Sequence, residues 1–254
     1  ARMAEAGEKD SAYHRITAQD AIDAGVLSWE GVDDARSKLP DNVARELFDA
    51  IASDDTGNPF NGLAGDAISR CYGVLHSERE PVCWGWDLAK YNDWTVGIAL
   101  DHLGDVCRFE RFQRPWEETT ETIASLVGST KAVIDATGVG DPIVERLIRK
   151  LGNNVEAYVL TGPSKQRLME GLAVVIQSQD ISYPEGVISQ ELESFEYEYT
   201  RTGVKYSAPE GMWDDCVTAL GLVVSGCTFG ARSSEVIVPS YRGDLTHGVA
   251  QDVY

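Results

Sequence analysis

Trp84-Gly-Trp-Asp-Leu-Ala-Lys90 and Val133-Ile-Asp-Ala-Thr-Gly-Val-Gly140 are the two stretches that specify the centre of this protein. In each, an aspartate, Asp87 or Asp135, ends an apolar run rich in aromatic or β-branched residues. Such a run predicts a buried strand whose last side chain emerges at a sheet edge, where the sites of α/β proteins usually lie. A third acidic site, Asp214-Asp215, precedes the apolar segment 216–224 and predicts the start of a helix packed on the same sheet.

The neighbouring segments predict a mixed sheet. Strand-like runs with short polar turns between them predict an antiparallel meander, over residues 82–88, 94–101 and 106–113. Helical and strand-like segments then alternate, with helices expected at 116–127, 141–151 and 164–177 and strands at 131–135 and 155–161. A hairpin at 196–206 and a closing helix at 213–225 follow. Because such alternation requires parallel pairing, we expect an α/β fold with three antiparallel strands, then parallel strands, and helices on both faces.

The sheet is expected to occupy residues 76–230, with a flanking segment on either side. Residues 1–75 are polar, show helical spacing around 18–24 and 40–51, and hold too few apolar residues for a core of their own. We therefore expect a linker or a flanking helical segment there. Residues 231–254 show no clear periodicity and are expected to form a tail.

The composition of the 254-residue chain predicts a globular protein and argues against tight, autonomous DNA binding. Hydrophobic residues make up 43%, enough for a buried core, and no run of about 18 apolar residues predicts a membrane span. The five cysteines form no CxxC pair, which favours a reducing cytoplasm. The net charge of −19 opposes a nucleic-acid ligand, because sequence-independent DNA affinity comes from Lys and Arg. A nuclease of this charge would need metal ions at its acids and another domain or subunit to hold the DNA.

Carboxylates gathered at one sheet edge predict a site for divalent metal ions. Asp87 and Asp135 end strands that can lie side by side, and the late helix would bring Asp214 or Asp215 to them. Mg²⁺ prefers oxygen ligands and keeps several waters, so few carboxylates suffice. Two ions about 3.5–4 Å apart can activate a water and stabilise the leaving oxygen of a phosphodiester. Without metal, mutual repulsion is expected to raise the pKa of at least one of these carboxyl groups.

This order of strands and acids is similar to that of the ribonuclease H-like superfamily. Within it, the motifs resemble the nuclease domain of the large terminase subunit of tailed bacteriophages. They are Gly85-Trp-Asp-Leu-Ala-Lys90 with Asp93 and Thr95, Ile134-Asp-Ala-Thr-Gly-Val-Gly-Asp-Pro142, Ser164-Lys165, and Trp213-Asp-Asp-Cys-Val-Thr-Ala-Leu220. Trp213 departs from the family, where a histidine is common at this position. The sequence also lacks the Gly-x-x-x-x-Gly-Lys-Ser/Thr loop of the family's ATPase motor.

The resemblance implies a function and the residues that perform it. By it, Asp87, Asp135, Asp214 and Asp215 are the catalytic, metal-binding acids of a two-metal site for Mg²⁺ or Mn²⁺, with Asp87 bridging the ions. The implied activity is endonucleolytic hydrolysis of double-stranded DNA, with little sequence preference, during phage DNA packaging. The implied partners are DNA, an ATPase motor domain that this chain lacks, the portal and the small terminase subunit. The implied location is the cytoplasm of the infected bacterial host.

Other functions and plainer roles stay open from the sequence. The architecture also suits a Holliday-junction resolvase, a Mg-ATP-binding domain of the actin and sugar-kinase type, or a non-enzymatic assembly module with a relict site. The Asp214-Asp215 pair could simply cap a helix, and Asp135 could belong to a tight turn or a phosphate-cradling loop. Lys165 and Lys90 are either phosphate contacts or solvated lysines, and the hairpin at 195–207 is either a lid or an ordinary sheet edge.

Overall fold

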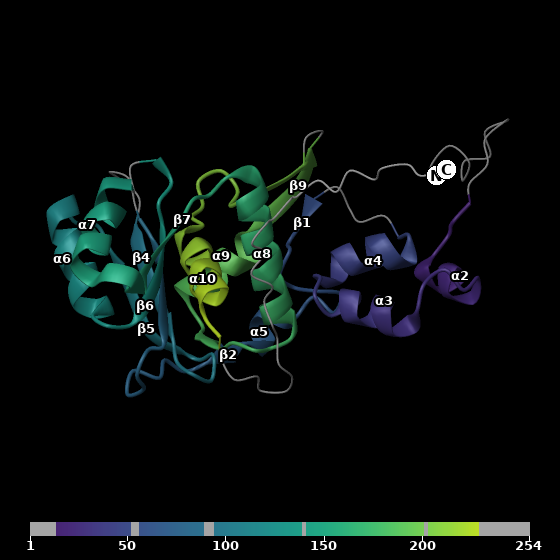
Figure 1. Cartoon of the computed structure of the whole chain (residues 1–254), viewed down its shortest axis with the longest axis horizontal. Helices are drawn as coiled ribbons and strands as arrows, with labels where there is room; N and C mark the ends of the chain where they lie inside the picture. The colour runs from purple at the N-terminus through teal and green to yellow at the C-terminus, as the bar shows by residue number, and fades with distance from the viewer. Residues whose placement is uncertain (1–13, 52–55, 89–93, 139–140, 201–202, 229–254) are drawn as a thin grey trace, which may run out of the picture.

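A computed structural model describes residues 14–51, 56–88, 94–138, 141–200 and 203–228, built around a five-stranded mixed sheet (Figure 1). The strand order is β5-β4-β3-β6-β7. These strands are β3 (Cys83–Asp87), β4 (Thr95–Leu100), β5 (Val106–Phe112), β6 (Lys131–Asp135) and β7 (Val155–Tyr158). The first three pair antiparallel, and β6 and β7 continue the sheet parallel to β3. The expected mixed α/β sheet is therefore confirmed, with β3 at its centre.

Helices cover both faces of the sheet, as expected (Figure 1). One face carries α6 (Trp116–Val127) and α7 (Asp141–Leu151), and the other carries α8 (Gly162–Gln177) and α10 (Asp215–Gly226). Alternation along β3 explains the division, because successive side chains of a strand point to opposite faces. Trp84 and Trp86 pack on the α6/α7 face, where their ring centroids lie 5.1 Å apart. Cys83, Gly85 and Asp87 consequently face α8 and α10.

Some elements differ in extent from the sequence expectation. β7 ends at Tyr158 rather than at 161, because Thr161 is the N-cap of α8, where its side chain accepts a hydrogen bond from the backbone N–H of Ser164. α10 begins at Asp215 rather than at 213. The predicted hairpin forms as β9 (Glu196–Thr200) and β10 (Gly203–Ser207), and a further short strand, β1 (Thr56–Gly57), pairs with β9.

Several short elements were not predicted from the sequence. They are α5 (Ala67–Arg70), β2 (Tyr72–Gly73), β8 (Tyr183–Pro184) and α9 (Val187–Ser194). Of these, α9 bears on the site, because it packs against α10. It holds its place through Ile188 and Leu192, which are buried in the same core as α8 and α10.

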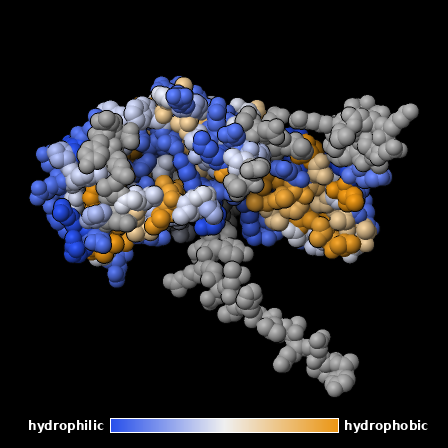
Figure 2. Space-filling model, turned by 90° about the horizontal axis from the view of Figure 1, so that it is seen from above, coloured by the Kyte–Doolittle hydropathy of each residue, from blue (hydrophilic) through white to orange (hydrophobic). Residues whose placement is uncertain are grey.

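The N-terminal helices extend from the end of the molecule opposite α6 and α7 (Figure 1). They are α2 (Ala18–Asp23), α3 (Trp29–Arg36) and α4 (Asp41–Asp49), of which α3 was not expected. Figure 2 shows apolar side chains gathered over this end, and Trp29 and Leu47 are 60% and 64% exposed. The segment thus has little core of its own, while its boundary with the sheet domain at residue 75 stays a prediction.

Some expectations concern residues beyond the described ranges. Lys90, the tip of the hairpin at 201–202 and the expected tail at 231–254 all lie outside them. Across the ranges that are described, no helix is both long and apolar enough to cross a membrane.

Candidate metal centre

Asp87 and Asp135 lie side by side at the carboxyl edge of the sheet. β3 and β6 are adjacent and parallel, with Trp86 paired to Ile134, so the next residue on each strand is one of the two acids. Both side chains are partly buried. Because Asp87 and Asp135 take equivalent positions after this pairing, they point to the same face of the sheet, the one covered by α8 and α10.

Gly85 allows α10 to lie directly on β3. A Cβ atom at Gly85 would lie 2.1 Å from the carbonyl oxygen of Ala219 and 2.3 Å from the amide nitrogen of Val223, both on the backbone of α10. No side chain fits in that space, so glycine is required for the close approach of helix and strand. The contact fixes the height of α10 above the strand that ends in Asp87.

The direction of α10 then places its first residues over the two strand acids. Gly226, at the far end of the helix, lies against Cys83 at the start of β3, so α10 runs antiparallel to the strand. Asp215 precedes Ala219 by one helical turn, and Asp87 follows Gly85 by two residues on the same face of β3. The two steps are of similar length, so the Asp214-Asp215 pair meets the edge formed by Asp87 and Asp135.

The start of α10 is capped by a residue from another helix. Asp214 occupies the N-cap position, yet within the described residues its side chain makes no capping hydrogen bond. The backbone N–H of Cys216 donates instead to Oε2 of Glu191, from α9, over 2.7 Å. The Asp214 carboxylate lies against the Lys165 ammonium, with Nζ and Oδ2 3.0 Å apart. The plain capping role for Asp214 is therefore wrong, because its carboxylate points elsewhere.

Asp135 combines a turn with its place at the site. Its Oδ1 accepts hydrogen bonds from the backbone N–H and the hydroxyl of Thr137, at 2.8 and 2.5 Å. The Thr137 hydroxyl oxygen in turn accepts a bond from the backbone N–H of Leu160, at 2.7 Å. Both bonds to Asp135 use the same oxygen. The tight turn, which the sequence left open as an alternative role for Asp135, is thus present, and it orients the carboxylate.

The electrostatics centre on Asp87. Part of its surface is exposed, so a cation can reach it. Burial of its carboxyl group raises the pKa of Asp87 well above the usual range, and the nearby carboxylates of Asp135, Asp215 and Asp214 raise it further. The Lys165 ammonium acts in the opposite direction. The four acids named from the sequence therefore lie close enough to interact electrostatically.

The donor chemistry of this group fits a hard divalent cation. All four acids offer carboxylate oxygens, which Mg²⁺ and Mn²⁺ prefer, and a cation would remove the repulsion that burdens Asp87. Their side chains do not yet converge, since among the described residues no three His, Cys, Asp or Glu side chains are arranged as metal ligands. The strands and α10 nevertheless bring the acids close enough for their charges to interact.

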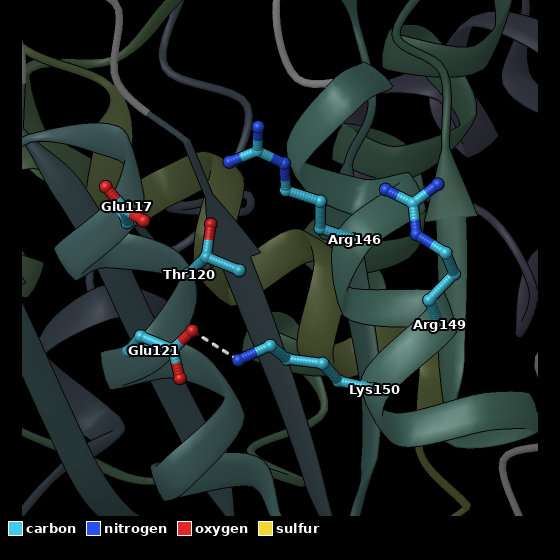
Figure 3. Close-up of a pocket in the computed structure, with 6 residues that line it drawn as sticks. All are labelled: Glu117, Thr120, Glu121, Arg146, Arg149 and Lys150. Carbon is cyan, nitrogen blue, oxygen red and sulfur yellow. Dashed lines mark hydrogen bonds and ion pairs between the residues drawn. The ribbon is translucent and has the colours of Figure 1, made fainter.

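A separate hollow lies between α6 and α7, on the opposite face of the sheet (Figure 3). Its volume is about 180 Å³, and it is lined by Glu117, Thr120, Glu121, Arg146, Arg149 and Lys150. Lys150 reaches from α7 to form an ion pair with Glu121 of α6. Opposite charges pair across this hollow, so it differs in kind from the acidic edge.

Two residues that matter to the site were missed in the sequence. Gly85 belongs to the first sequence motif, but a single sequence does not show that a helix backbone lies where its Cβ would be, 2.1 Å from the Ala219 carbonyl oxygen. Glu191 lies in a helix that was not predicted, and its partner is a backbone amide 25 residues away. For Gly85, the one available signal was the presence of a glycine inside a predicted buried strand, which often marks a close approach of another backbone.

Known proteins that are similar to this chain in sequence and in structure are large terminase subunits of phages. The chain is similar to the large terminase subunits of Thermus phage G20c and Thermus virus P23-45, each 29% identical over 150 residues, or 56% of this chain and 31% of the relative. It thus spans about a third of the length of these curated relatives. It is also similar to the large terminase nuclease from thermophilic phage G20c with bound magnesium, with a TM-score of 0.55 and 25% identity over 63% of this chain and 95% of that one.

The family model described as the terminase RNaseH-like domain matches residues 84–225, more than half of the chain. The match begins in β3 and ends in α10, so it includes Asp87, Asp135 and the Asp214-Asp215 pair. This chain belongs to the terminase RNaseH-like domain family, as its sequence motifs indicated.

Proposed function

We propose that this chain is the nuclease part of a phage DNA-packaging terminase and cuts double-stranded DNA, with little sequence preference, in a reaction that depends on Mg²⁺ or Mn²⁺. The observation that carries the proposal is the release of Asp214 from its capping position. An aspartate at an N-cap ordinarily accepts a hydrogen bond from the first turn. Here Glu191 fills that role, and Asp214 adds a fourth carboxylate to the group around Asp87.

Each acid has a role that follows from its place. Asp87, at the end of the central strand, interacts with all three others and is the one suited to contact both ions. Asp135 is oriented by its bonds to Thr137, and the Asp214-Asp215 pair approaches from α10. Bound metal ions would activate a water and stabilise the leaving oxygen of the phosphodiester.

Lys165 is placed to offset part of the negative charge of the acids when no metal is bound. Its ammonium is partly exposed, lies 3.0 Å from Asp214 and lowers the pKa of Asp87. Its position beside the acids also suits a contact with a phosphate of the DNA, whose negative charge it would offset.

The charge of the chain sets the conditions under which activity is expected. A net charge of −19 opposes DNA binding, so the isolated chain is expected to bind DNA weakly and to lose binding steeply as salt rises. In our proposal an ATPase motor domain, together with the portal and the small terminase subunit, holds the DNA near the site in the cytoplasm of the infected bacterium.

The test is cleavage of supercoiled plasmid at low salt, with Mn²⁺, with Mg²⁺ and with chelator. The Asp87→Asn variant is compared with Asp34→Asn, which makes the same change of charge at an exposed position on α3. We expect metal-dependent nicking and linearisation by the wild-type and Asp34→Asn proteins and none by Asp87→Asn. Full activity of Asp87→Asn would refute the assignment of the site.

Three further measurements separate the other functions. A branched-DNA substrate cut much faster than linear duplex would indicate a junction resolvase instead. Thermal stabilisation by Mg-ATP, without cleavage, would indicate a nucleotide-binding domain. Absence of divalent-metal binding by the wild-type protein would leave an assembly module with a relict site.

A further inference from the structure

Glu191 is a buried carboxylate that the proposed chemistry does not use. It lies on α9, is 6% exposed and points to the start of α10. Burial raises the pKa of Glu191, which means that its ionised form is costly there. A glutamate is seldom kept in such a position unless its oxygens have specific partners.

One oxygen of Glu191 replaces the missing helix cap. The first backbone N–H groups of a helix have no partner within the helix, and a side chain at the N-cap usually supplies one. In α10 that side chain would be Asp214, but the Cys216 N–H is taken by Oε2 of Glu191 at 2.7 Å. A negative charge at this end also interacts favourably with the helix dipole.

The other oxygen of Glu191 forms an ion pair with an arginine of the sheet. Oε1 of Glu191 lies 3.5 Å from Nη2 of Arg111, and the Arg111 guanidinium stacks over the Trp94 ring at 4.7 Å. Arg111 on β5 is paired with Val96, which is paired with Asp87 on the neighbouring strand. Directly paired residues face the same side of a sheet, so Arg111 and Asp87 belong to one row of side chains.

We infer that Glu191 is a positioning residue of the metal site: it caps α10 in place of Asp214 and so leaves the Asp214 carboxylate available to a metal ion. This inference rests on the proposed metal-dependent function and names a residue for it that contacts neither metal nor DNA. Without the Glu191 cap, Asp214 holds the N-cap position from which a side chain ordinarily accepts from the first turn, and a capping Asp214 would turn away from Asp87.

Two conservative variants separate the length of the Glu191 side chain from its charge. Glu191→Gln keeps the length of the side chain and a carbonyl oxygen that can accept the Cys216 N–H, but loses the charge. Glu191→Asp keeps the charge but is one methylene shorter, so its oxygen falls short of a bond that is now 2.7 Å long. Glu193→Ala, at an exposed position of the same helix, is the matched control for loss of an acid.

The measurement is the dissociation constant of Mn²⁺ for each metal-stripped 254-residue protein, by titration calorimetry, with amide hydrogen exchange at Cys216 as a direct probe of the cap. Removing a group that orients metal ligands typically weakens binding about 10–100-fold. We expect a loss of that order in Glu191→Asp, together with faster exchange at Cys216. Glu191→Gln and Glu193→Ala are expected to stay within about threefold of the wild type.

Other outcomes have definite meanings. Wild-type affinity in Glu191→Asp, or an equal loss in both Glu191 variants, would overturn the capping role, because the cap needs the side-chain length that Glu191→Gln keeps and Glu191→Asp loses. A loss in Glu191→Gln alone would show that charge, not the cap, is what matters. If the wild-type protein itself binds no Mn²⁺, the proposed function fails first, and this inference fails with it.

Discussion

Replacing Gly85 with alanine is the sharpest single test of how the site is assembled. The new Cβ would lie 2.1 Å from the Ala219 carbonyl oxygen and 2.3 Å from the Val223 amide nitrogen. Ordinary contacts of a Cβ begin at 3.4 Å, so both distances are too short by more than 1 Å. Because both obstacles are backbone atoms of α10, no side-chain rotation can relieve the overlap, and the helix itself has to move.

The expected magnitude follows from that displacement. Overpacking of a core costs about 1–3 kcal/mol, and for a chain of this size each kcal/mol lowers Tm by about 2–4 °C. We therefore expect Gly85→Ala to lower Tm by about 2–12 °C. Asp215 lies one turn before Ala219, so it moves with the helix, and a shift of about 1 Å at a reacting centre can cost on the order of 100-fold in rate. Metal-dependent cleavage is expected to fall by about that factor.

Thermal unfolding followed by circular dichroism, together with plasmid cleavage, tests both numbers. Gly171→Ala in α8 is the matched control, because a Cβ there meets nothing within 4 Å. The same substitution inside a helix should stabilise the protein, by about 0.5–1 kcal/mol, and leave cleavage unchanged. A Gly85→Ala protein with wild-type Tm and wild-type cleavage would refute the close packing of α10 on β3.

Two further predictions concern the charges at the acidic edge. Because the pKa of Asp87 is raised in the folded protein, its ionised form opposes folding: the penalty is absent below the usual aspartate pKa and complete above the raised one. Asp87→Asn should therefore raise Tm in chelator at neutral pH, a gain that vanishes toward pH 4, and should abolish the rise in Tm that Mn²⁺ gives the wild type; a lower Tm would contradict this. Lys165→Met removes the ion pair with Asp214 and should lower the metal-free Tm by about 1–3 °C, yet give a larger rise with Mn²⁺, since no ammonium competes for Asp214. A smaller rise would show that Lys165 assists metal binding instead.

The strands that carry the site could be predicted because their sequence signal is local. Asp87 and Asp135 each end a short apolar run, and the structure ends β3 and β6 at those residues. The helices at 116–127 and 141–151 were predicted with their observed bounds, since their apolar residues recur at helical spacing. Where the period and the boundary residues both lie within one segment, the sequence is sufficient.

α9 could not be predicted in this way, for a physical reason. It has eight residues, too few to be stable alone, and it contains Ser189 and Ser194, which are weak helix formers. Its stability comes from packing Ile188 and Leu192 against segments distant in sequence. The role of Glu191 was hidden for the same reason, because it depends on where the end of α10 lies in space.

The Asp214-Asp215 pair had two possible roles from the sequence. From the sequence, the resemblance implies a metal-binding role for this pair and a plain helix cap is the alternative, and the structure would have supported the alternative had Asp214 bonded the first turn. Instead the protein brings a buried glutamate from α9 to do so, and places Asp214 with the acids around Asp87, whose charge is already unfavourable. If the only need were a stable helix start, an asparagine or serine at 214 would serve without this repulsion. The added like charge is unfavourable for the protein alone, and in our proposal a divalent cation bound there would offset it.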